Sequence, residues 1–243
     1  MDKKIPQATI EAFARSIFKE ATKYGFGQID VIKLINQLMG LCNPDDFGDS
    51  PAAAEEVIHR KLEPGAASTL PIRSERIHIR EFDAGTDLVL FDQWLPDRYG
   101  RFFVLSCATA QEITVDALVE DTRNHIGIVT RPDGKPVGAM AYLDHSRRQR
   151  RAELRKLIGE PDARGHGLAE EATWLWIQYG IHGLGLEKIY VSTLQTQITN
   201  VELNERIGFR VEGLLKNEVL IDGERCDVLR MGLSASDLRT DAD

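Results

Sequence analysis

The run Arg164–Ala169 (RGHGLA) limits the fold of this chain most, because it places two glycines and a basic residue where a strand-like segment meets a helical one. Upstream, Ala152–Ile158 has the length of a strand, and Gly159 and Pro161 predict the turn that ends it. Downstream, apolar residues recur at helical spacing, namely Leu168, Ala169, Ala172, Leu175, Trp176 and Tyr179. The sequence therefore predicts a strand, a tight glycine turn and an amphipathic helix in succession.

The chemistry of this junction favours an anionic ligand. Glycines leave backbone N–H groups uncovered at the positive end of a helix, and that arrangement binds phosphate. The spacing is not that of the dinucleotide fingerprint, and no Gly-Lys-Ser/Thr ending of an NTPase loop is present. On spacing alone, a phosphate-binding turn and a connection without a ligand both stay open.

Three parts of motif A of the GNAT superfamily, the acyl-CoA-dependent N-acetyltransferases, have counterparts here. Ala152–Leu154, Ile158–Pro161 and Arg164–Ala169 resemble that motif, whose signature is Arg/Gln-x-x-Gly-x-Gly/Ala. Asn200–Phe209 is similar to the motif B helix, which closes on a Gly-Phe pair. The resemblance thus rests on two separate motifs in the expected order.

A third segment extends the resemblance over roughly Ile77–Leu233. Val211–Leu214 is followed by a hairpin that turns at Asp222–Gly223 and ends at Arg230–Met231. This ending resembles the branch that holds the ribosomal-protein N-terminal acetyltransferases and the spermidine acetyltransferases. The resemblance implies an α/β fold with a mixed, partly splayed β-sheet flanked by helices, preceded here by an extra N-terminal helical region.

The resemblance also implies the reaction. The acetyl group of acetyl-CoA would pass to a primary amine, by direct attack of that amine on the thioester. The acceptor would be a small molecule, an amino sugar or a protein N-terminus. Two alternatives stay open, which are a longer acyl-CoA donor and a module that binds acyl-CoA without turnover.

The same resemblance assigns the acyl-CoA site. The pantetheine arm would follow the end of the strand at Leu157, Ile158 and Gly159. The pyrophosphate would meet the N–H groups of a continuous run, Arg164, Gly165, His166, Gly167, Leu168 and Ala169. Further hydrogen bonds to the arm are expected from Gln197, Asn200 and Asn204, although Asn200 could instead only cap its helix.

Acyl transfer needs a group that accepts the proton of the amine and a donor that meets the developing oxyanion. Glu153 occupies the position of a glutamate that accepts this proton in some members of the superfamily; alternatively, it only pairs with a neighbouring arginine. His125 and His145 are further candidates for the base. Cys107 would permit an acyl-enzyme, but nothing near it in the sequence lowers its pKa.

Asn204 departs from the family pattern. Many relatives carry a tyrosine four residues before the Gly-Phe pair, where it protonates the departing thiolate, and an amide has no ionisable proton to give. The thiolate would then leave unaided or take a proton from water, or the enzyme is impaired. This departure keeps the non-catalytic alternative open.

The acceptor pocket is expected in the loop between two predicted helices, Thr86–Trp94 and Thr114–Thr122. By resemblance, its lining would include Tyr99, Arg101, Phe102 and Phe103, although an aromatic run is also typical of a core. The basic run Arg147–Arg151 is either a solvated turn or a docking site for an anionic acceptor.

The predicted organisation is a helical region over 1–63, a linker over 64–74, the acyltransferase domain over 75–235 and a tail over 236–243. The first helix has an apolar stripe of Ile10, Phe13, Ile17 and Ala21, a second covers 31–38, and a third starts near Ser50. Such short helices should pack on the catalytic domain, on a second subunit or on a partner, or serve only as a structural cap.

Composition narrows the class of protein. A net charge of −8 argues against general nucleic-acid binding and fits a cationic amine as acceptor. The three cysteines, Cys42, Cys107 and Cys226, cannot all pair and lie at no metal-ligand spacing, so we expect a reducing compartment and no metal. The start lacks the pattern of a signal peptide and no run of residues is apolar enough to span a membrane, which predicts a cytoplasmic protein. A homodimer is left open.

Overall fold

The computed structural model describes residues 7–26, 31, 34–35, 68–96, 100, 103, 114–194, 198–221 and 223–238. The chain divides into two units, 1–54 and 55–243, and each is described by itself. In the first unit, helix α1 (Gln7–Lys23) lies where the apolar stripe predicts a helix. Its apolar residues are largely exposed, with Phe13 at 68%. Most of the second predicted helix and all of the third fall outside the described residues.

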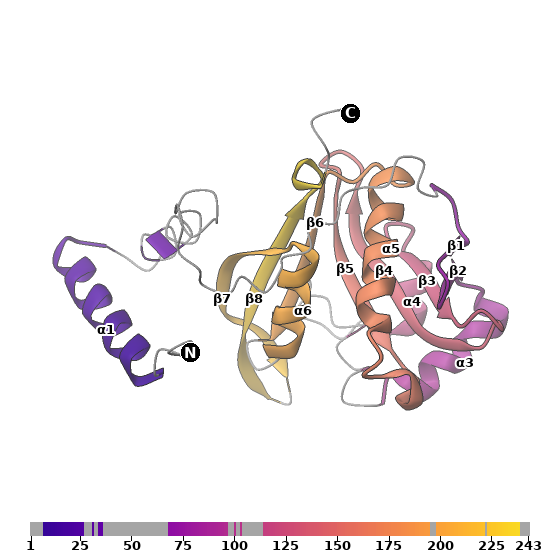
Figure 1. Cartoon of the computed structure of the whole chain (residues 1–243), viewed down its shortest axis with the longest axis horizontal. Coiled ribbons are helices and arrows are strands. Elements are labelled where there is room, and N and C mark those ends of the chain that lie inside the picture. The colour runs from indigo at the N-terminus through magenta and orange to yellow at the C-terminus, as the bar shows by residue number, and fades with distance from the viewer. Residues whose placement is uncertain are drawn as a thin grey trace. The chain divides into compact units, whose positions relative to one another are not determined.

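The second unit is built on a mixed eight-stranded sheet of order β1-β2-β3-β4-β5-β6-β8-β7 (Figure 1). The strands are β1 (Ile72–Arg73), β2 (His78–Glu81), β3 (His125–Thr130), β4 (Pro136–Ser146), β5 (Arg151–Ile158), β6 (Lys188–Leu194), β7 (Arg210–Ile221) and β8 (Glu224–Ser234). β5 and β6 pair in parallel, whereas the other neighbours are antiparallel. A parallel pair needs a crossover connection, which helix α5 (Leu168–His182) supplies. The predicted mixed α/β sheet is thus confirmed.

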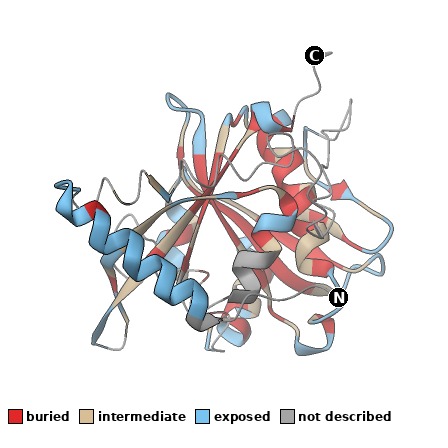
Figure 2. Ribbon diagram, turned by 60° about the vertical axis from the view of Figure 1, so that its left-hand side comes forward, coloured by how far each residue is buried: buried red, intermediate tan, exposed pale blue. Residues whose placement is uncertain are grey.

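Helices cover both faces of this sheet. Figure 1 shows α5 and α6 (Ile198–Ile207) on the near face and α3 (Ala84–Trp94) and α4 (Val115–Glu120) on the far face. The larger core cluster joins the sheet to α5, and a second cluster joins it to α3 and α4. Buried residues accordingly concentrate along the central strands (Figure 2).

The two faces of β4 show how the sequence forms these layers. Tyr142 points to α5, where its hydroxyl donates to the carbonyl oxygen of Trp176 at 2.8 Å and the two rings stack. Leu143, the next residue, packs in the cluster of Phe91 and Trp94 on α3. Because both faces of β4 are buried, the strand is apolar almost throughout rather than alternating.

The predicted domain limits differ from the structure at both ends. The range 64–74 was expected to be a linker, but Ile72 pairs with Ile79 in the sheet and is only 3% exposed. The range 236–243 was expected to be a tail, but Leu238, after the turn η2 (Ala235–Asp237), is buried in the larger core. Both segments are too short to show a periodicity. Ile72 is held by its pairing with β2, and Leu238 by its packing in the larger core.

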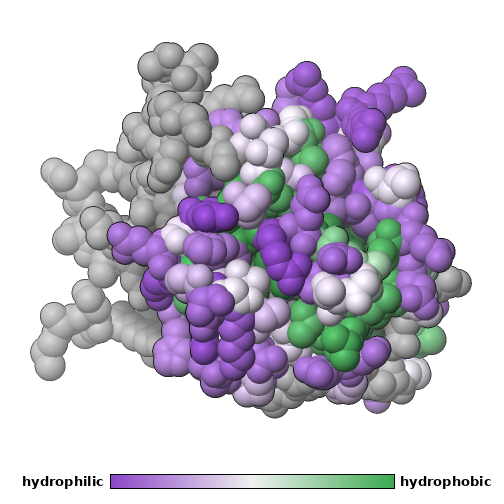
Figure 3. All heavy atoms as spheres, turned by 90° about the vertical axis from the view of Figure 1, so that its right-hand side faces the viewer, coloured by the Kyte–Doolittle hydropathy of each residue, from purple (hydrophilic) through white to green (hydrophobic). Residues whose placement is uncertain are grey.

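The surface at the β1–β2 edge is mixed. Seen from the side that Figure 1 has on the right, hydrophilic residues lie around several hydrophobic areas, the largest of them at the lower right of the view (Figure 3). The homodimer stays a prediction. None of the helices in the described part of the chain is long and apolar enough to cross a membrane.

An ion pair between the partly exposed Arg80 and the buried Asp87 holds α3 against β2 and yields a first prediction. Asp87 is 1% exposed and accepts two hydrogen bonds from the guanidinium of Arg80, at 2.7 and 2.8 Å. We expect Asp87→Asn to lower the free energy of unfolding by about 2 kcal/mol, since it removes a charge-assisted, bidentate contact. Urea denaturation measures this. Asp92→Asn, at an exposed position of the same helix, should change little; equal effects of the two would contradict the account.

Candidate active site

The central feature of the site is the place where two parallel strands separate. β5 and β6 are joined by three residue pairs, of which Glu153–Tyr190 is the last. Both strands continue beyond this pair, β5 to Ile158 and β6 to Leu194. Beyond this point β5 pairs with β4 along its other edge. Beyond Glu153, the backbone groups of β5 that face β6 are not paired with that strand, and the carbonyl oxygen of Ile158 accepts from Arg164. This edge can therefore pair with an extended ligand.

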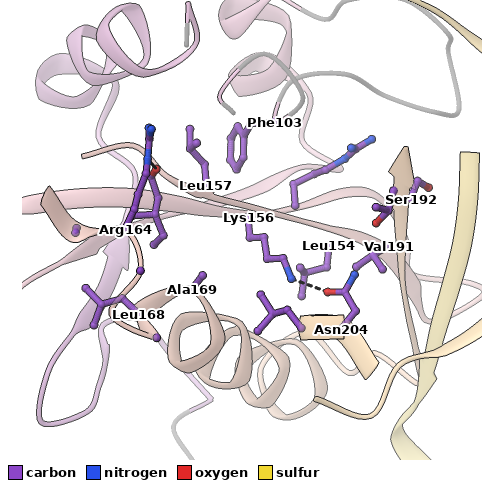
Figure 4. A pocket seen from close by; sticks show the side chains of 17 residues that line it. Phe103, Leu154, Lys156, Leu157, Arg164, Leu168, Ala169, Val191, Ser192 and Asn204 are labelled. Atoms are coloured by element: carbon purple, nitrogen blue, oxygen red, sulfur yellow. Dashed lines mark hydrogen bonds between the residues drawn. The ribbon is translucent and has the colours of Figure 1, made fainter. Parts of the chain in front are cut away.

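A cavity of about 330 Å³ opens at this separation (Figure 4). Its walls come from the end of β5, the loop before α5, the middle of β6 and one face of α6. The described residues that line it are Phe103, Leu154, Arg155, Lys156, Leu157, Ile158, Ala163, Arg164, Gly165, Gly167, Leu168, Ala169, Val191, Ser192, Thr193, Leu203 and Asn204. Eight of the predicted acyl-CoA residues, Leu157, Ile158, Arg164, Gly165, Gly167, Leu168, Ala169 and Asn204, are thus brought together.

The glycine loop forms the mouth of the cavity near the N-terminus of α5. Gly165 and Gly167 have φ of +79° and +76°, in the left-handed region that glycine adopts without strain. Gly167 is the N-cap of α5, and no described side chain caps that end. The guanidinium of Arg164 donates to the carbonyl oxygens of Ile158 and Gly159 at 2.9 and 2.8 Å, which ties the loop to β5. The N–H groups at the positive end of α5 can therefore meet an anion.

Two residues near the loop have roles that differ from, or add to, the prediction. Gly159 is absent from the cavity lining; a Cβ there would lie 2.2 Å from the Trp94 ring, so this glycine permits close packing of α3. Arg76, which the sequence did not indicate, donates to the carbonyl oxygen of His166 at 3.0 Å and pairs with Glu171. His166 also lies outside the lining, and its carbonyl anchors Arg76 beside the loop.

A lysine that the sequence analysis missed lies inside the cavity. Lys156 is on the face of β5 that points to α5 and α6, and its Nζ donates to Oδ1 of Asn204 at 2.5 Å (Figure 4). Burial lowers the pKa of Lys156 to about 7; the charge of Glu170 acts in the opposite direction, and that of Arg206 adds to the lowering. The signal in the sequence was a charged residue at a strand position between Leu154 and Ile158.

Asn204, predicted to bind the pantetheine arm, is held from two sides. It is 1% exposed, and its Nδ2 lies 3.8 Å from Sδ of Met231 on β8. Its oxygen is engaged by Lys156, so the amide fixes the position of that ammonium group. The side chain of Asn200 and the whole of Gln197 lie outside the described residues.

Glu153 points to the opposite face of β5. Its carboxylate is fully buried, with Oε1 at 3.1 Å from Nη2 of Arg155, and it does not line the cavity, whereas Arg155 does. Burial, followed by the charge of Glu153, raises the pKa of neighbouring Tyr190 to about 12. The ion pair is the one expected if Glu153 only pairs with a neighbouring arginine. Because Glu153 is adjacent in sequence to Leu154, which lines the cavity, its role as a proton acceptor stays a prediction.

Of the four residues expected to line the acceptor pocket, Phe103 is the one that lies among the described residues. That ring is buried, lines the cavity and packs 5.7 Å from the ring of Phe91. Tyr99, Arg101, Phe102 and Cys107 lie outside the described residues.

The remaining candidates lie away from the cavity. Nε2 of His125 is 2.9 Å from Nδ1 of His145, and burial lowers the pKa of both rings. Neither histidine lines the cavity. The basic turn 147–150 is exposed and precedes β5, at the end of that strand away from Leu157 and the cavity. In the described part of the chain, no group of three or more His, Cys, Asp or Glu could hold a metal ion.

Comparison with known proteins agrees with this geometry. The model of the acetyltransferase (GNAT) domain family matches residues 76–210, which is more than half of the chain. The spermidine N(1)-acetyltransferase of Escherichia coli (strain K12) is 26% identical over 159 residues, covering 65% of this chain and 80% of the relative. A probable N-acetyltransferase of Bacillus subtilis (strain 168) is 25% identical over 108 residues, 44% of this chain and 60% of the relative.

Solved structures show the same fold. The spermidine N-acetyltransferase from Vibrio cholerae, in complex with CoA and spermine, aligns with a TM-score of 0.57 and 22% identity, over 68% of this chain and 99% of that chain. The chain therefore belongs to the GNAT acetyltransferase family. Its activity is the transfer of an acetyl group from acetyl-CoA to an amine, and the splayed edge of β5 with the glycine loop fits that donor.

The loop yields a second prediction. Gly167→Asp should weaken acetyl-CoA binding at least tenfold in titration calorimetry, because it places a side chain and a negative charge at the anion-binding end of α5. Gly134→Asp is the matched control, since Gly134 also has a left-handed φ and open surroundings but lies in the β3–β4 turn. The account would be wrong if both variants bound the donor equally well.

Proposed function

We propose that the acceptor of this acetyltransferase is a polyamine, with spermidine as the first candidate. The Escherichia coli relative, which matches over most of its length, is named for that activity. A net charge of −8 favours a polycationic substrate. Peptide N-termini, amino sugars and other small amines are the remaining acceptors.

The observation that carries the acyl-transfer function is the bare edge of β5 beside the glycine loop. In the proposed complex, Leu157 and Ile158 hold the pantetheine arm through their main chain, and the loop from Arg164 to Ala169 holds the pyrophosphate. Gln197 and Asn200 are proposed to add hydrogen bonds to the arm. This arrangement positions the thioester near the place where β5 and β6 separate, and positioning supplies much of the acceleration.

Glu153 is proposed to accept the proton of the attacking amine, directly or through a water molecule. Its carboxylate lies at the last paired position before the strands separate, and Arg155 fixes its orientation from within the same strand. Glu153→Gln keeps the shape of the side chain and removes its basicity. We expect kcat to fall by about 10²- to 10⁴-fold, with the affinity for acetyl-CoA nearly unchanged.

Steady-state kinetics and calorimetry on the same preparation test this role. Glu224→Gln, at an exposed position on β8, is the control and should keep full activity. A Glu153→Gln enzyme with normal kcat but lower thermal stability would assign Glu153 to the ion pair with Arg155 alone.

The acceptor pocket is proposed to include Tyr99, Arg101, Phe102 and Phe103. Aromatic walls would contact the methylene groups of a polyamine and attract its cationic ends. Initial rates of CoA release with spermidine, spermine, a peptide N-terminus and an amino sugar, at a fixed acetyl-CoA concentration, identify the class. We expect the highest kcat/KM with a polyamine.

Two results would overturn parts of this proposal. Turnover of a peptide N-terminus or amino sugar with no turnover of polyamines would replace the acceptor class. Tight binding of acetyl-CoA without turnover of any of these amines would favour a binding module, and longer acyl-CoA donors would be tried next.

A further inference from the structure

We propose that Lys156 is the general acid of this enzyme, donating a proton to the CoA thiolate as it departs. The inference rests on the acetyl transfer described above and concerns the step that Asn204, which has no ionisable proton, cannot perform. It is carried by the position of Lys156 inside the cavity and by its hydrogen bond to Asn204 (Figure 4).

Among the described side chains that line the cavity, Lys156 is chemically best suited to donate a proton. Among the described residues that line the cavity, the groups with an acidic N–H are Arg155, Lys156 and Arg164. An arginine does not release its proton near neutral pH, and the hydroxyls of Ser192 and Thr193 do not release theirs either. Lys156 is therefore the lining group, within the described part of the chain, that can both give up and regain a proton under these conditions.

The hydrogen bond to Asn204 gives the ammonium group a defined position. Asn204 is buried and also contacts Met231, so its amide has little freedom to move away. One N–H of the ammonium donates to Oδ1 of Asn204, and two further N–H donors remain for a ligand in the cavity. The asparagine thus serves as a positioning residue for Lys156.

The charged groups around Lys156 and its burial suit the proposed role of proton donor. From α5 the charge of Glu170 faces it, and from α6 that of Arg206, and these two side chains form an ion pair at 3.6 Å. Arg155 and Arg164 line the same cavity, whereas Asn204 and Met231 are uncharged. Burial is the largest effect and lowers the pKa to about 7, close to the value at which an acid transfers and recovers a proton efficiently.

In the proposed step, Lys156 gives up its proton as the carbon–sulfur bond of the thioester breaks. The nitrogen of the amine forms a bond to the carbonyl carbon, the carbon–sulfur bond breaks, and sulfur leaves with the electron pair. The ammonium of Lys156 transfers one proton to that sulfur, which yields the CoA thiol and a neutral lysine. The nitrogen of the amine loses one proton to Glu153 or to water. Glu153 then releases its proton to solvent and Lys156 regains one from solvent, so the net products are the amide and CoA.

Two variants of Lys156 distinguish the loss of proton donation from the loss of positive charge. We expect Lys156→Met to lower kcat by about 10²-fold or more, with KM for acetyl-CoA within a few-fold of the wild type. Lys156→Arg keeps a positive charge but releases no proton near neutral pH, so it should be as slow as the methionine variant. Lys188→Met, on β6 and outside the cavity, is the control and should stay active.

The pH profile gives a readout that a structural role would not move. Since the protonated lysine is the active form, kcat of the wild type should fall as pH rises through the pKa of Lys156, which lies near 7 in the unliganded protein. This falling limb should be absent in Lys156→Met, whose rate should only rise as the acceptor amine loses its proton. An arginine variant with near-normal kcat, or a falling limb that persists in the methionine variant, would overturn the proposal.

A binding measurement tests the contact without any turnover. Lys156→Met should weaken CoA about tenfold in titration calorimetry and leave desulfo-CoA, which lacks the sulfur, unchanged. Equal effects on both ligands would show that Lys156 does not contact the sulfur and would overturn the proposal. A wild type that binds CoA but acetylates no amine would instead refute the proposed function, and the two failures are thereby distinguished.

Discussion

The separation of β5 from β6 after the Glu153–Tyr190 pair is the constraint on which the site depends. A parallel pair that continued to Ile158 and Leu194 would satisfy the backbone of both strands and close the cavity. Instead, β4 holds one edge of β5, the crossover helix α5 starts at the end of that strand, and the facing edge is left for a ligand. The glycine loop and the strand edge are adjacent because they belong to one strand–turn–helix unit.

The alternation of β5 divides the ionisable groups of the site between two faces. Glu153 and Arg155 point to one side, and Lys156 points to the other, toward α5 and α6. The proposed proton acceptor, Glu153, and the proposed proton donor, Lys156, would thus act on the two sides of a thioester bound along the strand edge. Because two residues of one strand, at positions of opposite parity, supply both groups, their separation onto two faces follows from the pleat and needs no distant element.

Local patterns of the sequence predicted much of this arrangement. The glycines 165 and 167, the helix that follows them and the Gly-Phe end of α6 are short-range features, and the mixed sheet follows from the resemblance that they carry. Contacts between distant segments could not be predicted in the same way. Arg76 reaches the loop from the turn before β2, Ile72 joins the sheet edge, and Lys156 meets Asn204 through the packing of α6. Asn204 was expected to hold the pantetheine arm, and its bond to Lys156 depends on tertiary structure alone.

Hydrogen–deuterium exchange with and without acetyl-CoA tests the central claim most directly, because it reports on the backbone of the strand edge itself. The account predicts slower exchange in the segments 154–158 and 164–169 when acetyl-CoA is bound, and no change in the β3–β4 turn. Binding detected by calorimetry, with unchanged exchange in both segments, would contradict the claim that the edge of β5 and the glycine loop hold the donor.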